Sequence, residues 1–117
     1  MATDHVCLAA REDGRVVVER CLVAARPLRR MRGLLGRREL PAGEGILLTP
    51  AASIHTFFMR FSIDAVFLDR EHVVVDIARD VRPWRAVGRR RAHAVLELPA
   101  GESARRGLRA GEELVRA

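Results

Sequence analysis

A chain of 117 residues, 49% of them hydrophobic, is large enough to bury one core without a metal or disulfide, so a disordered chain is excluded. No apolar run approaches the roughly 20 residues that span a bilayer, and the N-terminus lacks the features of a signal peptide. The formal net charge is +6, but every basic residue is arginine, so compositional bias accounts for part of it. We expect one cytoplasmic domain over residues 1–117 with no membrane segment, and the sequence leaves its oligomeric state open.

The first predicted element is a β-hairpin. Residues 5–10 and 15–24 are apolar runs rich in β-branched side chains, separated by a Glu-Asp-Gly turn. Asp-Gly between such runs is a strong hairpin signal. Cys7 and Cys21 fall in these runs without the spacing of a zinc site, and we expect two buried, reduced thiols.

A helix is predicted next. Pro27 suits its first turn, apolar residues recur at helical spacing from Leu28 to Leu35, and Gly36 is placed to end it. A polar turn then leads to a short strand at residues 46–48.

The segment 53–69 is the most distinctive part of the chain. It is rich in Phe, Ile and Val and predicts two strands, bent or joined near Phe61 and Ser62. Period-2 alternation places His55, Phe57 and Met59 on one face of the first strand. Met59 is expected to fill the core.

A strand predicted at 73–78 forms a meander with the two strands of the segment 53–69. The remaining predicted elements are a loop at 80–92, a strand at 94–98, a short helix at 102–106 and an edge strand at 112–116.

Several sequence blocks, in this order and spacing, resemble the Domain of Unknown Function 192 family. The blocks are residues 32–37, 45–48, 55–60, 63–69, 96–101 and 111–112. Ser62 stands where many relatives carry proline. The resemblance implies an α+β fold: a strongly curved, partly barrel-like, mainly antiparallel sheet with one or two short packed helices. It implies no activity.

Asp64 allows two interpretations, because carboxylates are almost never fully buried without partners. As a functional group it would bind a ligand or act as a general base. As a structural group it would pair with Arg60 or cap the backbone of a turn.

The loop segment Arg82-Pro83-Trp84-Arg85 is the best recognition candidate. It offers two guanidinium groups beside the only tryptophan, a surface suited to a flat or anionic ligand. Alternatively, Trp84 covers an open end of the sheet and the arginines are solvated.

Two further polar residues lie within apolar strands. His55 shares its predicted face with phenylalanine and methionine, which favours a structural role. Glu97 is placed either on a solvated face or in a polar interior beside Arg60 or Arg85. No histidine or cysteine spacing indicates a metal, and no sequence motif indicates a cofactor or a catalytic site.

Two runs of arginine remain. They are Arg26, Arg29, Arg30, Arg32, Arg37 and Arg38, and then Arg79, Arg82, Arg85, Arg89, Arg90 and Arg91. If both lay on one face they would suit phosphate or nucleic acid, although no nucleic-acid motif accompanies them.

Our leading hypothesis is a small binding or accessory module that recognises an anionic small molecule or an acidic partner segment. The site would use Arg60, Arg82, Trp84 and Arg85, oriented by Asp64 and His55, with Glu97 nearby. The alternative is a nucleic-acid-binding protein, and a third class is a small hydrolase or transferase that uses Asp64 or His55.

Overall fold

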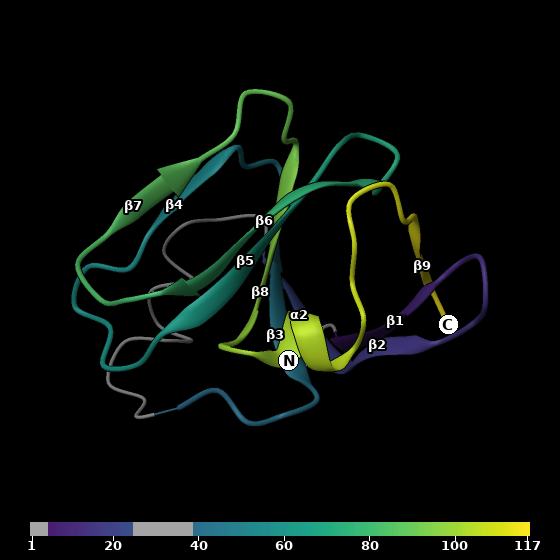
Figure 1. Ribbon diagram of the computed structural model, residues 1–117, viewed down its shortest axis with the longest axis horizontal. Coiled ribbons are helices and arrows are strands. Elements are labelled where there is room, and N and C mark those ends of the chain that lie inside the picture. Colours follow the sequence, from purple (N-terminus) through teal and green to yellow (C-terminus); the bar gives the residue numbers. More distant parts are fainter. Residues whose placement is uncertain (1–4, 25–38) are drawn as a thin grey trace.

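A computed structural model describes residues 5–24 and 39–117, which are the coloured parts of Figure 1. The helix predicted between Pro27 and Gly36 lies outside these residues, as does the first arginine run.

Most of the described chain is β-strand. The strands are β1 (His5–Ala10), β2 (Val16–Ala24), β3 (Glu44–Leu48), β4 (Ser53–His55), β5 (Ile63–Leu68), β6 (Val74–Val81), β7 (Ala86–Gly88), β8 (Ala94–Pro99) and β9 (Leu114–Arg116), and one short helix, α2, spans Glu102–Arg105. Seven strands form the main sheet in the order β6-β5-β8-β3-β2-β1-β9. Only the pairing of β2 with β3 is parallel among these described strands.

The central strands β5 and β8 are buried on both faces. Alternate residues of β5 enter two separate apolar clusters: Val66 and Leu68 pack in one, and Ala65 and Phe67 in the other. The first cluster includes Leu8 of β1 and Leu114 of β9, while the second includes residues of β4 and β7. A strand that is covered on both faces has an unbroken apolar sequence, and β5 has one apart from Asp64.

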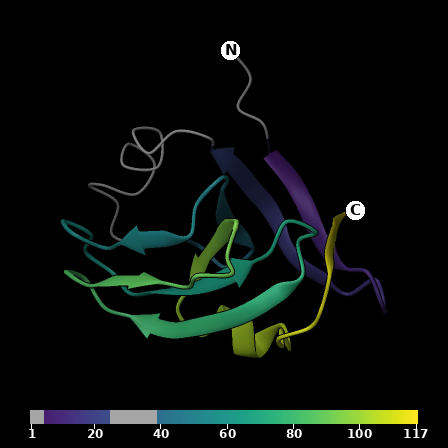
Figure 2. The same cartoon turned by 90° about the horizontal axis from the view of Figure 1, so that it is seen from above.

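Strands β4 and β7 form a separate two-stranded sheet, which corrects the predicted meander and the predicted loop. Ile54 of β4 pairs with Val87 of β7, and neither strand joins the main sheet. Figures 1 and 2 show the pair lying beside the main sheet. The alternation assigned to residues 54–60 therefore ends at His55.

The fold class is confirmed in part. The mainly antiparallel sheet, the hairpin of β1 and β2, and the short helix near residue 102 are present. The described residues are predominantly β rather than a balance of α and β. The sheet is not closed into a barrel, because among the described strands only an isolated bridge between Val73 and Glu113 joins the two edges.

In the described ranges, no helix has the length and apolar character required to cross a membrane.

Both cysteines are free thiols, as expected. Cys21 is fully buried in β2, and Cys7 on β1 is half-buried. Burial raises the pKa of the Cys21 thiol to about 12, because the charged thiolate loses its solvation.

We predict that iodoacetamide at about pH 8 modifies Cys7 and spares Cys21 in the folded protein, since the thiolate is the reactive form. The raised pKa keeps the Cys21 thiol protonated until the pH approaches about 12. Mass spectrometry is expected to show one adduct in native buffer and two in guanidinium chloride. Equal native modification of both thiols would contradict this.

Candidate functional site

Thr56 links two loops that are distant in sequence, residues 56–62 and residues 82–85. Its backbone N–H donates to the Arg85 carbonyl oxygen at 2.8 Å, and its own carbonyl oxygen accepts from the Trp84 N–H at 3.0 Å. Its hydroxyl donates to the Arg82 carbonyl oxygen at 2.6 Å and accepts from the Arg85 N–H at 2.9 Å. Thr56 is fully buried, so its own end of each bond is shielded from water.

The linked loops present an aromatic cluster, Phe57, Phe58 and Trp84. These side chains are 39%, 62% and 56% exposed. The rings of Phe57 and Trp84 stack at 5.8 Å between centroids, and Phe58 tilts against Trp84 at 4.7 Å. Exposed aromatic side chains that contact one another are typical of binding surfaces.

Two members of the aromatic cluster also carry backbone strain. Phe58 has φ 67° and Trp84 has φ 65°, in the left-handed region that bulky residues rarely adopt. Such conformations cost of order 1–3 kcal/mol each and concentrate at functional sites. The Thr56 hydrogen bonds hold the Trp84 loop in place despite this cost.

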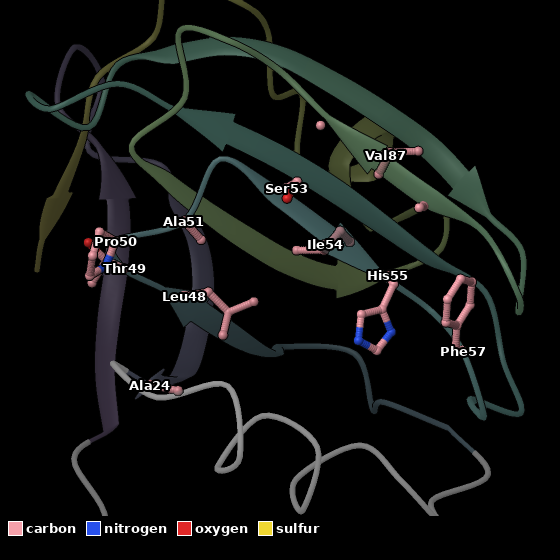
Figure 3. Close-up of a pocket in the computed structure, with 12 residues that line it drawn as sticks. Ala24, Leu48, Thr49, Pro50, Ala51, Ser53, Ile54, His55, Phe57 and Val87 are labelled. Atoms are coloured by element: carbon pink, nitrogen blue, oxygen red, sulfur yellow. The ribbon is translucent and has the colours of Figure 1, made fainter.

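A groove of about 630 Å³ begins beside the aromatic cluster (Figure 3). Its lining residues are Ala24, Leu48, Thr49, Pro50, Ala51, Ser53, Ile54, His55, Phe57, Ala86, Val87 and Gly88. His55 and Phe57 lie at one end and Thr49 and Pro50 at the other. The rings of His55 and Phe57 are 4.9 Å apart, so the groove runs directly into the cluster.

Three exposed arginines surround the aromatic cluster in sequence: Arg60, Arg82 and Arg85. The last two line a second hollow of about 420 Å³, where Asp80 is the one acidic residue among the described lining. Within residues 5–24 and 39–117, no carboxylate forms an ion pair with any of the three arginines. Ala86 and Val87 line both hollows, so the apolar groove and the arginine-lined hollow adjoin at strand β7.

Asp64 is fully buried and has a structural role. One carboxylate oxygen accepts from the Asp80 N–H at 2.9 Å. The other accepts from the Gly101 N–H at 3.2 Å, and from the Ser103 N–H and hydroxyl at 3.1 and 2.5 Å. The carboxyl group thus joins the end of β6 to the turn that precedes α2.

Glu97 is also fully buried, in the middle of β8. It lies opposite Ile46 of β3 and Ala65 of β5 in the sheet register. The structure therefore places Asp64 and Glu97 in the interior. His55, Arg82, Trp84 and Arg85 lie on the connected β4, β7 and loop segments, with Arg60 in the loop that Thr56 begins.

Sequence reasoning missed three contributors to the surface. The sequence pattern predicts Phe57 and Phe58 as strand residues and assigns no role to Thr56. The available signal was the Phe57-Phe58 pair itself, since two large apolar neighbours break the alternation of a half-buried strand. The partner loop of Thr56 is 26 residues away in sequence, and no local pattern points to it.

The sequence profile of the DUF192 family, described as Uncharacterized ACR, matches residues 8–115. This chain belongs to that family. The match includes Thr56, the aromatic cluster and the described lining of the groove.

Proteins of similar sequence carry the family name UPF0127. A UPF0127 protein of Thermococcus sibiricus is 36% identical over 99 residues, which cover 80% of this chain and 64% of that protein. A UPF0127 protein of Pyrococcus abyssi is 51% identical over 51 residues, 43% of each chain. The matches thus span less than two thirds of the length of these relatives.

Two solved structures share the fold. A protein of unknown function from Novosphingobium aromaticivorans has a TM-score of 0.80 at 23% identity, covering 97% of this chain and 84% of its own. A protein of Sinorhizobium meliloti, provisionally named a transcription regulator, has a TM-score of 0.82 at 24% identity, covering 98% and 94%. At these identities the likeness establishes the fold alone.

We predict that Thr56→Val lowers the free energy of unfolding by about 2–3 kcal/mol, because the part-buried Arg82 carbonyl and Arg85 N–H lose their partner. Urea unfolding followed by circular dichroism measures this. Thr49→Val is the matched control, since the described residues give the half-buried Thr49 side chain no hydrogen bond, and it is expected to change stability by less than about 0.5 kcal/mol. Equal effects of the two changes would contradict the role of Thr56.

We also predict that Asp64→Asn destabilises the fold by about 2–4 kcal/mol, since either amide orientation turns an N–H group toward a backbone donor. The exposed Asp76, whose pKa is lowered by the Arg89 guanidinium, supplies the control. Asp76→Asn is expected to cost no more than about 1 kcal/mol. Similar unfolding midpoints for both variants would refute the structural assignment of Asp64.

Proposed function

We propose that this protein is a binding module that recognises an anionic small molecule at the aromatic cluster and its flanking arginines. One observation carries the proposal: the exposed aromatic rings contact one another on two loops that Thr56 joins by hydrogen bonds, and the same loops carry Arg60, Arg82 and Arg85, which have no acidic partner among the described residues.

Both parts of this surface favour the same kind of ligand. A guanidinium group binds carboxylate or phosphate through two parallel N–H bonds, and these charge-assisted bonds are stronger than neutral ones. An aromatic ring offers a flat apolar face on which a planar group can stack. The hydrogen bonds of Thr56 join the two loops before a ligand binds, which limits the entropy lost on binding.

A second candidate is single-stranded nucleic acid, because exposed aromatic rings beside arginine are the usual stacking surface for unpaired bases. The provisional name of the Sinorhizobium meliloti protein is compatible with this candidate but concerns that protein. Phosphate-dominated binding weakens steeply as salt is raised, which separates it from a small-molecule site.

We predict that Arg82→Ala with Arg85→Ala reduces affinity for the best of a panel of carboxylated and phosphorylated small molecules by at least about tenfold, since each charge-assisted bond contributes about 1.5–3 kcal/mol. Trp84 is the only tryptophan, so its fluorescence reports binding at the site.

The matched control is Arg90→Ala with Arg91→Ala, which removes the same charge from two nearby exposed positions. This control is expected to bind within about twofold of the wild type. Equal losses in both double variants would mean general charge attraction and would refute the site. Tight, steeply salt-dependent binding of generic single-stranded DNA would favour the second candidate instead.

A further inference from the structure

The apolar groove continues the proposed binding surface. Phe57 lines the groove and also stacks on Trp84, so the groove and the aromatic cluster share a wall. The inference below rests on the proposed function and concerns the chemical class of its ligand.

The described lining of the groove is mostly apolar. Leu48, Ile54 and Val87 contribute its larger aliphatic side chains. Among the described residues that line it, none is aspartate, glutamate or arginine, and His55 is the one titratable group. Its volume of about 630 Å³ falls in the range of roughly 300–1,000 Å³ typical of small-molecule sites.

The described groove lining holds no aspartate, glutamate or arginine, and Arg82 and Arg85 line the second hollow, which shares Ala86 and Val87 with the groove. Arg85 directly precedes Ala86, which lines both the groove and the arginine hollow. The opposite end, at Thr49 and Pro50, has no charged residue in the part of its lining that the structure describes. A ligand that fills the apolar groove and also binds Arg82 and Arg85 carries its charge at one end only.

We propose that the ligand is an amphipathic anion, with an alkyl or aryl body in the groove and a single carboxylate or phosphate head at Arg82 and Arg85. Burial of the body supplies hydrophobic free energy in proportion to its area. The arginines would then select against neutral molecules with the same body.

Four probes test this in the full chain through Trp84 fluorescence and calorimetry: octanoate, octyl phosphate, octanol and acetate. Octanoate or octyl phosphate is expected to bind at least about ten times more tightly than both octanol and acetate. The comparison of octanoate with octyl phosphate identifies the head group.

Two neighbouring alanines provide a matched pair of variants. Ala51 lines the groove, whereas Ala52 is exposed and does not. Ala51→Phe fills the groove and is expected to weaken octanoate or octyl phosphate by about tenfold or more, while Ala52→Phe stays within about twofold. If Ala51→Phe does not fold, amide chemical-shift mapping on the wild type replaces it, with changes expected at β4 and β7.

The outcomes separate the two proposals. If octyl anions bind no better than acetate, or if both phenylalanine variants behave alike, the groove assignment is overturned while an arginine-dependent site stands. If octanol binds as tightly as octanoate, the amphipathic anion is overturned in favour of a neutral apolar ligand. If no anion shows a response that depends on Arg82 and Arg85, the proposed function itself fails.

Discussion

The fold depends on one constraint: β5 and β8 are buried on both faces and must be covered from both sides. The strands β1, β2 and β9 contribute to the apolar cluster on one side. On the other side β4 and β7 pack as a second small sheet and contribute to the second apolar cluster. Ile54, Met59 and Val87 belong to this second cluster. The groove and the aromatic cluster both lie where that cover was added.

Burial of the central strands also decides how their acidic residues are used. A carboxyl group inside a sheet requires hydrogen-bond donors, and Asp64 obtains four of them from Asp80, Gly101 and Ser103. These donors come from the end of β6 and from the turn at α2. Asp64 therefore holds together elements that the strand ladders alone do not connect.

The surface around Trp84, in contrast to the buried acidic residues, is exposed and locally unfavourable. Exposing its apolar rings to water costs free energy, and two of its residues have strained backbone conformations. The hydrogen bonds of the buried Thr56 offset part of that cost by fixing both loops at once. Local features that reduce stability and yet are held in place by buried contacts are the usual mark of a functional surface.

The amino-acid sequence by itself determined the family, the hairpin of β1 and β2, the strands β3, β5, β6 and β8, the short helix α2 and the core position of Met59. These features are local: alternation, turn chemistry and unbroken apolar runs are visible within a few residues. Tertiary structure alone decided that β4 pairs with β7, that Asp64 and Glu97 are interior, and that Thr56 joins loops 26 residues apart. Pairings between distant segments depend on which surfaces remain to be covered once the central strands are in place, and no short stretch of sequence carries that information.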